Sequence, residues 1–365
     1  MVFIDIKTLG ELKSLLTLHF TPTFSMASEI KKILIIRFSS IGDIVLTTPA
    51  IRAAKTQLKD VEVHFATKEQ YRIIVENNPY IDKVHYYNEN LGQLIKSLKQ
   101  ENFDFVIDLH KNLRTKIIKT QLGKKSSSFQ KLNIQKWLYV NFKVNKLPNV
   151  HIVDRYLDAL KPLGVKNDGL GLDYFIPEKD EVEVSWLPET HREKYFVFAI
   201  GGQHATKKLP LKRMIELCDR INKPVILLGG KEDEKTGEEI ANFFDRSKEN
   251  KYYKKGLEEL KKKAVIFNGC GKFNLNQSAS IVRNADAVFT HDSGLMHIAS
   301  AFKKRIFSIW GSTSPFFGMY PYKTQFSIFE NNKIKCRPCS KIGFKKCPKG
   351  HFKCMNDVVF DFWLP

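Results

Sequence analysis

Residues 31–54, KKILIIRFSSIGDIVLTTPAIRAA, decide the fold class of this chain. Residues 33–36 form an apolar run of strand length, which is typical of a parallel strand that is covered on both faces. Small and polar residues follow, and apolar residues then recur at helical spacing from Ile44 onward. The pattern predicts a strand, a tight turn and a helix. Open α/β sheets bind their ligands at such turns.

Asp43 lies in this turn beside Gly42, and its position supports two interpretations. As a helix cap, it would accept a backbone N–H and stabilise the positive end of the helix dipole. As a catalytic group, it would take a proton from a substrate hydroxyl, while Gly42 would let the backbone come close. The chain has neither a G-x-G-x-x-G turn here nor a G-x-x-x-x-G-K-[ST] loop anywhere, which disfavours a dehydrogenase and a P-loop enzyme.

Length and composition indicate a globular protein of two domains. The 365 residues exceed what one hydrophobic core usually serves, and 43% of them are hydrophobic. No apolar run is long enough to span a bilayer, and residues 1–29 lack the pattern of a signal peptide, so we expect a cytoplasmic protein. Met26 reads like an ordinary start, so residues 1–30 are interpreted as an extension that is either native or the result of an upstream start codon.

The net charge of +20 is unevenly placed. Residues 111–146 hold ten Lys or Arg and no acidic residue, a block that favours phosphates, nucleic acid or an acidic membrane surface as partners. A solvated lysine-rich surface is the alternative. A nucleic-acid-binding protein is the rival function for the whole chain, but the block lacks the interleaved aromatic residues of a stacking platform.

Strand-like and helix-like segments alternate twice along the chain, over 33–109 and again over 195–310. The rhythm predicts two parallel sheets with crossover helices and a small-ligand cleft between them. We expect a first domain at 31–165, a linker at 166–194, a second domain at 195–330 and a cysteine-rich tail at 331–365.

Three polar turns follow predicted strands of the second half, and together they suit a nucleotide diphosphate. The first supplies backbone N–H groups at 201–202 and two cations, Lys207 and Lys208. The second offers Glu232, Asp233 and Glu234 as acceptors for ribose hydroxyls, and the third begins a helix whose first N–H groups, at 293–294, can hold an anion. His291 and His297 flank this third turn, either as structural histidines or as phosphate or sugar contacts.

Four cysteines close the chain with the spacing C-x2-C-x7-C-x6-C, namely Cys336, Cys339, Cys347 and Cys354. They could wrap a structural zinc ion, with His351 as a competing ligand, or form a loop that closes over the core. Disulfides are disfavoured in a reducing compartment.

Five motifs, in this order, resemble those of the heptosyltransferase family, glycosyltransferase family 9. The resemblance covers about residues 31–356 and rests on RFSSIGDIVLTTPAIRA (37–53), DLHKNLRT (108–115), GGQHATKKLP (201–210), HDSGLMHIA (291–299) and WGSTSP (310–315). Two departures stand out. Leu209 occupies a position where family members often have Trp, and the chain stops at Pro365 with little of the C-terminal helix expected to cross back to the first domain.

The resemblance implies a GT-B architecture, in which two Rossmann-like, doubly wound α/β domains face a cleft. The first domain would bind the acceptor and the second a nucleotide sugar, with ADP-heptose as the expected donor. Transfer would invert the anomeric carbon and need no cofactor. The expected acceptor is an anionic glycolipid of the lipopolysaccharide-core type, which would place the protein at the inner face of the cytoplasmic membrane, without a nucleic-acid partner.

The resemblance also implies roles for residues of the five motifs. Asp43 is expected to be the general base, and Lys207 to contact the diphosphate. The residues expected to bind the donor are Gly201, Gly202, Lys207, Glu232, Asp292, Ser293, Gly294, His297 and Thr313, and those expected to bind the acceptor are Ser40, Gly42, Asp108, His110 and Arg114.

Overall fold

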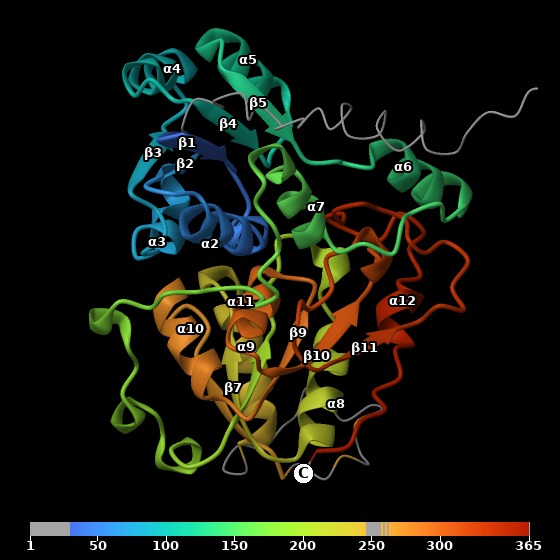
Figure 1. The fold of residues 1–365 in the computed structure, drawn as a ribbon. Helices are drawn as coiled ribbons and strands as arrows, with labels where there is room; N and C mark the ends of the chain where they lie inside the picture. Colours follow the sequence, from blue (N-terminus) through green and yellow to red (C-terminus); the bar gives the residue numbers. More distant parts are fainter. Residues whose placement is uncertain (1–29, 246–256, 258–259, 261–262, 365) are drawn as a thin grey trace, which may run out of the picture. The chain divides into compact units, whose positions relative to one another are not determined.

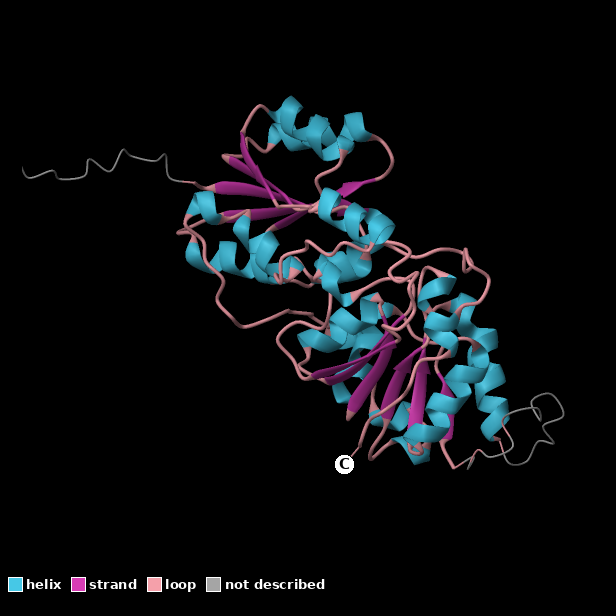
Figure 2. Ribbon diagram, turned by 90° about the vertical axis from the view of Figure 1, so that its right-hand side faces the viewer, coloured by secondary structure: helices cyan, strands magenta, loops and turns pink. Residues whose placement is uncertain are grey.

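The computed structural model describes residues 30–245, 257, 260 and 263–364, so the predictions for residues 1–29, including Met26, lie outside the described residues. The described chain contains two parallel sheets (Figure 1). Helices cover both faces of each sheet (Figure 2). No described helix has both the length and the apolar character needed to cross a membrane.

The first sheet has five strands in the order β3-β2-β1-β4-β5, all parallel. Its elements in chain order are β1 (Lys32–Ile36), α1 (Ile41–Val45), α2 (Thr48–Gln57), β2 (Glu62–Lys68), α3 (Arg72–Val75), β3 (Lys83–Tyr87), α4 (Leu91–Gln100), β4 (Phe105–Asp108), α5 (Leu113–Leu122), β5 (Lys125–Ser128), α6 (Asn133–Phe142) and α7 (Ile152–Asp158). The chain reverses its direction across the sheet between β1 and β4, which places a ligand site outside the carboxyl ends of these two strands.

The second sheet has six parallel strands in the order β11-β10-β9-β6-β7-β8, the strand order of a Rossmann fold. Its elements are β6 (Phe196–Ala199), α8 (Leu211–Ile221), β7 (Pro224–Leu228), α9 (Glu234–Phe244), β8 (Val265–Asn268), α10 (Leu275–Asn284), β9 (Ala287–His291), α11 (Gly294–Ala301), β10 (Arg305–Trp310) and β11 (Phe326–Glu330), followed by α12 (Lys353–Asn356) in the tail. Its reversal point lies between β6 and β9.

Successive side chains along each strand of the second sheet point to opposite faces and belong to two separate hydrophobic cores. Phe198 and Phe289 belong to one core, whereas Val197 and Val288, one residue earlier on the same strands, belong to the other. Both sets are buried because helices cover both faces, and this explains why the strands read as continuous apolar runs.

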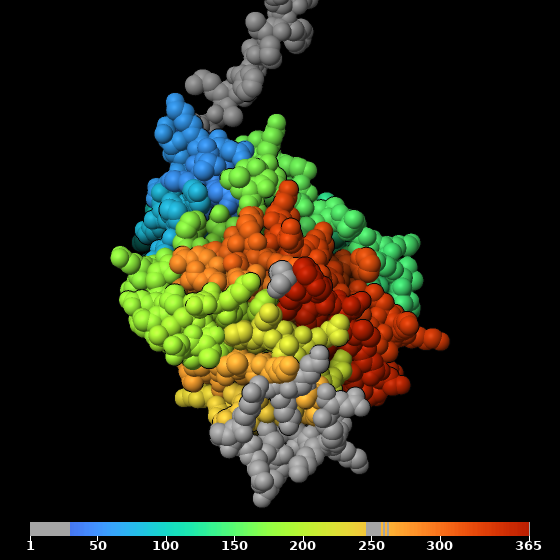
Figure 3. Space-filling model, turned by 90° about the horizontal axis from the view of Figure 1, so that it is seen from below, coloured from blue at the N-terminus to red at the C-terminus, as the bar shows by residue number. Residues whose placement is uncertain are grey.

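Viewed from below, linker residues (light green) and C-terminal residues (red) cover different sides of this half (Figure 3).

The doubly wound α/β fold predicted from sequence is confirmed, but the edge strands β5 and β11 were not foreseen. β5 (KSSS) has no apolar run, and it pairs only with β4 at the edge of the first sheet. β11 follows a long connection after β10 and is also an edge strand. The predicted linker at 166–194 contains only 3-10 turns, at Glu178–Asp180, Val184–Trp186 and Glu189–His191.

Candidate active site

The turn after β1 holds Asp43 in a network of hydrogen bonds. Arg37 forms an ion pair with this carboxylate, with Nη2 2.6 Å from Oδ1. Ser40 donates to the other carboxylate oxygen from its hydroxyl at 3.0 Å and from its backbone N–H at 3.3 Å. The guanidinium of Arg37 also donates to the carbonyl oxygens of Ser39 and Leu109, at 2.7 and 2.6 Å. The carboxylate is therefore fixed at the amino end of α1.

Ser40, rather than Asp43, is the N-cap residue of α1. Asp43 is the third residue of the helix and completes a capping box by accepting the N–H of Ser40. Burial raises the pKa of Asp43, but the charge of Arg37 and the hydrogen bonds from Ser40 outweigh it, so that the pKa lies below its ordinary value of 3.8. Since the side chain is still 22% exposed, Asp43 is an ionised carboxylate with an open side.

The turn after β4 lies beside this one, because Ile36 and Asp108 pair in register at the ends of β1 and β4. Asp108 is buried and accepts the backbone N–H groups of His110 and Lys111 at 3.0 and 2.6 Å. Its other oxygen lies 3.2 Å from Nζ of Lys119. These bonds use the carboxylate to shape the turn, and the predicted contact of Asp108 with the acceptor stays a prediction.

His110 and Arg114 are placed differently by this second turn. Burial, followed by the charges of Arg37 and Lys131, lowers the pKa of His110 to about 4, so its imidazole is neutral at pH 7. Arg114 is exposed on α5 and lies over the ring of Tyr87, 5.6 Å from the centroid. Among the described residues it has no hydrogen bond or ion pair with the Asp43 turn.

Three cations near Asp43 have no carboxylate partner among the described residues. Arg155 is only 3% exposed, donates to two backbone carbonyl oxygens at 3.3 and 2.9 Å, and leaves its Nε without a partner. Lys136 lies 5.9 Å from the ring centroid of Phe317, and burial, then the charge of Arg155, lowers its pKa to about 8. The third, Lys131, donates to backbone carbonyl oxygens. Cations held without counter-charges form a surface that can bind an anion.

In the second sheet, the turn after β9 binds the lysine predicted to contact the diphosphate. Nζ of Lys207 lies 2.7 Å from Oδ2 of Asp292, and the hydroxyl of Thr313 donates to the same oxygen at 2.9 Å. Ser293 is the N-cap residue of α11, and its hydroxyl lies 3.2 Å from that of Thr290. Asp292 thus links two other predicted donor residues, Lys207 and Thr313, at the amino end of one helix, where free N–H groups can donate hydrogen bonds to an anion.

The neighbouring Lys208 has a structural partner instead. Its Nζ lies 2.9 Å from Oδ1 of Asp233, which is buried and also accepts a backbone N–H at 3.1 Å. A Cβ at Gly201 would lie 2.8 Å from Oδ2 of Asp233, and one at Gly202 would lie 3.3 Å from Cγ of Lys208, so both glycines are needed for close packing. Glu232, predicted to accept ribose hydroxyls, is exposed.

The amino ends of α1 and α11 contact each other directly. A Cβ at Gly42 would lie 2.6 Å from Cδ2 of His297, and one at Gly294 would lie 2.7 Å from Cγ2 of Ile41. His297 is 2% exposed, its Nδ1 has no hydrogen-bond partner, and burial lowers its pKa to about 4. The fold therefore brings the Asp43 turn of the first sheet against the turn of the second sheet that precedes α11.

Comparison with known proteins assigns this arrangement to a family. The sequence profile of glycosyltransferase family 9 (heptosyltransferase) matches residues 91–348, which is more than half of the chain. This chain belongs to glycosyltransferase family 9. The glycosyltransferase is 25% identical over 307 residues to lipopolysaccharide heptosyltransferase 1 of Campylobacter coli, and the match covers 77% of this chain and 84% of that protein.

Solved structures of similar fold support the GT-B architecture of the glycosyltransferase. The structure of E. coli ADP-heptose lps heptosyltransferase II has a TM-score of 0.63 at 17% identity and covers 89% of this chain and 98% of that one. E. coli heptosyltransferase WaaC with ADP has a TM-score of 0.57 at 18% identity and covers 81% and 93%. Since the chain is an enzyme of this family, the nucleic-acid-binding alternative is set aside.

The cysteine-rich tail of the glycosyltransferase packs on the loop that follows β10 of the second sheet. Arg337 donates to the carbonyl oxygens of Gly311 and Thr313, at 2.6 and 3.1 Å. Cys336 Sγ lies 3.8 Å from Nε2 of His351, but no three of the predicted thiol and imidazole ligands have donor atoms within 4.8 Å of one another. The zinc site at Cys336, Cys339, Cys347 and Cys354 stays a prediction.

One group of metal-ligating residues lies at the amino end of the first sheet, away from these turns. His64 and His85 have ring nitrogens 2.8 Å apart, and Glu101 completes the group. Lys83 lies 2.5 Å and Lys32 3.4 Å from the carboxylate of Glu101. Two ammonium groups already neutralise the cluster, so we assign it a structural role.

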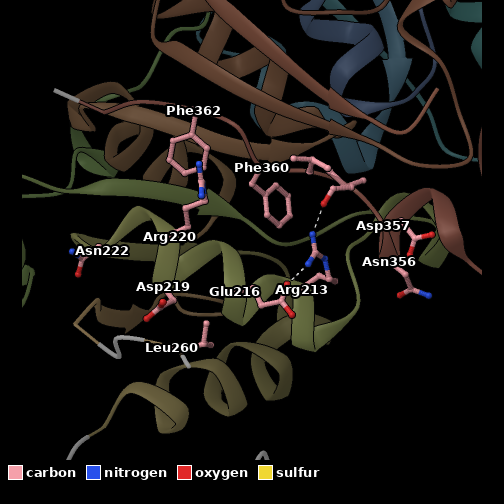
Figure 4. Close-up of a pocket in the computed structure, with 12 residues that line it drawn as sticks. Arg213, Glu216, Asp219, Arg220, Asn222, Leu260, Asn356, Asp357, Phe360 and Phe362 are labelled. Atoms are coloured by element: carbon pink, nitrogen blue, oxygen red, sulfur yellow. Dashed lines mark hydrogen bonds and ion pairs between the residues drawn. The ribbon is translucent and has the colours of Figure 1, made fainter. Parts of the chain in front are cut away.

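A groove of about 840 Å³ opens elsewhere on the glycosyltransferase, between α8 and the C-terminal residues (Figure 4). Arg213 spans it and bonds Glu216 and the carbonyl oxygen of Val358. None of its lining residues is a predicted site residue. The large groove and the candidate active site are therefore separate.

Sequence reasoning missed several residues that the fold adds to the site, and overinterpreted one. Arg37 belongs to the first motif, yet its ion pair with Asp43 was not predicted. Lys131 and Lys136 lie within electrostatic reach of Asp43, Arg155 lies within reach of Lys136, and each of these three is a single basic residue outside the five motifs. His291, interpreted as a possible ligand contact, is fully buried, and its Nε2 accepts the N–H of a buried leucine at 3.0 Å. It is a structural residue.

Proposed function

We propose that this enzyme moves heptose from ADP-heptose onto an anionic, lipid-linked acceptor of the lipopolysaccharide-core type, with inversion at the anomeric carbon. One observation carries the proposal, namely the contact between the turn that holds an ionised Asp43 and the helix end that can hold a diphosphate. The printed names of the relatives support it, because the Campylobacter coli protein is a lipopolysaccharide heptosyltransferase and the WaaC structure contains ADP.

The second domain would stabilise the leaving group. Lys207 and the first N–H groups of α11, at Ser293 and Gly294, would contact the diphosphate oxygens, where negative charge increases as the glycosidic bond breaks. Lys207 is paired with Asp292, so a bound diphosphate would compete with that carboxylate for the ammonium. His297, neutral and without a partner for its Nδ1, could donate or accept a hydrogen bond to the sugar or phosphate.

The first domain would supply the base. The carboxylate of Asp43 takes the proton of the acceptor hydroxyl while that oxygen forms a bond to the anomeric carbon. The bond from the anomeric carbon to the phosphate oxygen breaks, and ADP leaves with the electron pair. A single displacement needs one carboxylate that the acceptor hydroxyl can reach. Asp43 is fixed by Arg37 and Ser40 but keeps 22% of its side chain exposed, whereas the side chains of Asp108 and Asp292 are 1% and 11% exposed.

The unpaired cations around Asp43 account for an anionic acceptor. Lys131 and Lys136, which are partly exposed, would bind its carboxylate or phosphate groups and so hold the hydroxyl near the base, while the buried charge of Arg155 would add to the positive potential there. The reaction as proposed needs no cofactor. A zinc ion in the cysteine-rich tail would act on structure, because Arg337 in that tail supports the Thr313 loop of the donor side.

The test is a transfer assay with purified enzyme and a heptose-deficient core lipopolysaccharide as the acceptor. Separate reactions contain ADP-heptose, ADP-glucose or UDP-glucose, and the product linkage is assigned by NMR. We expect transfer from ADP-heptose, with an anomeric configuration opposite to that of the donor. Transfer from UDP-glucose alone, or retention of configuration, would contradict the proposal.

A further inference from the structure

Helix α6 (Asn133–Phe142) exposes large apolar side chains. None of its residues is buried. Ile134 is 73% exposed, Trp137 49% and Phe142 60%. The rings of Trp137 and Phe142 contact each other, with centroids 5.1 Å apart, so they form one apolar surface. Helices usually bury such side chains against a core or a partner.

The other side of α6 is attached to the second domain. Tyr139 lies 3.4 Å from the hydroxyl of Ser314, and its ring packs against Phe316 and Phe317. Directly after the helix, Lys143 donates to the carbonyl oxygens of residues 336 and 338 in the cysteine-rich tail, at 3.1 and 2.7 Å. Figure 1 shows α6 lying beside this tail, drawn in red. The apolar surface is thus presented by a helix that is fixed in place.

The surroundings of α6 are strongly basic. Residues 111–146 contain ten Lys or Arg and no acidic residue, and the exposed lysines include Lys116, Lys124 and Lys146. Lys131, just before the helix, donates to a backbone carbonyl at the start of the α5 region at 3.1 Å, which joins the two parts of the basic block. Exposed aromatic and aliphatic side chains among lysines are typical of a segment that lies in the headgroup region of an anionic bilayer.

We propose that α6 is a membrane anchor, which inserts Ile134, Trp137 and Phe142 into the interface of a bilayer containing anionic phospholipid. The lysines of residues 111–146 would contact the lipid headgroups. The proposal deepens the proposed function, since Lys136 on the same helix lies within the electrostatic reach of Asp43 and would hold the active site at the surface that carries a lipid-linked acceptor. Its test uses no transfer reaction, so the two proposals can fail separately.

The experiment measures cosedimentation of the full-length enzyme with vesicles of phosphatidylcholine, with or without 30% phosphatidylglycerol. The test variant is Ile134→Ser/Trp137→Ser/Phe142→Ser. The matched control is Val184→Ser/Trp186→Ser, which removes side chains that are 50% and 53% exposed outside the basic block. We expect the test variant to bind anionic vesicles about tenfold or more weakly than the parent, because three apolar groups no longer leave water. The control should bind like the parent.

Two further measurements make the result decisive. Equal Tm values of thermal unfolding without ligand in all three proteins show that the variants are folded, and a Lys116→Gln/Lys124→Gln/Lys125→Gln variant should show weaker binding and a reduced dependence on salt. Equal vesicle binding by the test variant and the parent would overturn the proposal. A second outcome would also overturn it. If the parent formed dimers and did not bind vesicles, and the test variant were monomeric, the apolar surface would join two copies of the chain.

Discussion

Replacing Lys207 or Lys208 with alanine should separate donor binding from stability. The family resemblance places the diphosphate contact at Lys207, and the structure shows that both lysines pair with carboxylates. Lys207 pairs with Asp292 beside the amino end of α11, and the carboxylate keeps the hydrogen bond of Thr313 when the lysine is removed. Lys208 pairs with Asp233, whose side chain is only 3% exposed.

The expected magnitudes follow from these partners. Lys207→Ala removes a charge-assisted bond to the diphosphate worth about 1.5–3 kcal/mol, which raises the Kd for ADP about 10- to 150-fold. The carboxylate of Asp292, freed of its ammonium, would also repel the nucleotide. Lys208→Ala leaves a buried carboxylate with one partner fewer, at a cost of about 1–3 kcal/mol in the free energy of unfolding.

Isothermal titration calorimetry with ADP and thermal unfolding without ligand measure the two effects. We expect a large rise in Kd and a small change in Tm for Lys207→Ala, and for Lys208→Ala a Tm lower by several degrees with a nearly unchanged Kd. Equal losses of ADP affinity in the two variants would refute the assignment of the diphosphate contact to Lys207.

Three further predictions concern other parts of the enzyme. Arg37 and Ser40 lower the pKa of Asp43 below 3.8, so the base is ionised above that pH. The fall of kcat/KM on acidification that results from protonation of Asp43 should therefore occur below pH 3.8. A fall near neutral pH that disappears in Asp43→Asn would contradict this prediction. Gly42→Ala should destabilise the fold by about 1–3 kcal/mol, because the new Cβ would clash with buried His297. Gly92→Ala is the control and should not destabilise the fold, because the nearest atom to its new Cβ lies 3.6 Å away. Equal Tm values for the two variants would argue against the α1–α11 contact. Enzyme purified with added zinc should contain about one ion per chain and lose it in the Cys336→Ser variant, and metal-free parent enzyme under the same conditions would remove the zinc prediction.

The strands that are covered on both faces could be predicted from sequence, because burial on two sides leaves a continuous apolar run, as in β1. The edge strands β5 and β11 could not be predicted, because each pairs with only one other described strand and is less buried. The sequence of β5, KSSS, contains no apolar residue. The exposure of α6 could not be predicted either. Its sequence contains several apolar residues, yet none of its residues is buried.

The site was predictable where motifs at strand ends meet, and not where single residues converge. Asp43 and Lys207 occupy turns whose position follows from the strand order. Of the adjacent residues Glu232 and Asp233, it is Asp233 that is buried, because its side chain packs against Gly201. The sequence does not show which of two adjacent acidic residues makes such a contact. Arg155, buried without a carboxylate, comes from a helix far along the chain and has no local signature.

The central claim is that Asp43 is the base of a transfer reaction whose donor is held by the other domain. Turnover of ADP-heptose with the core acceptor, measured for Asp43→Asn and the parent together with the Kd for ADP, tests it most directly. The amide is close in size to the carboxylate and can accept the N–H of Ser40, so the turn should persist. We predict a kcat lower by about 10²- to 10⁴-fold with an unchanged Kd for ADP. Turnover near that of the parent would contradict the claim and leave Asp43 as a residue of the helix cap alone.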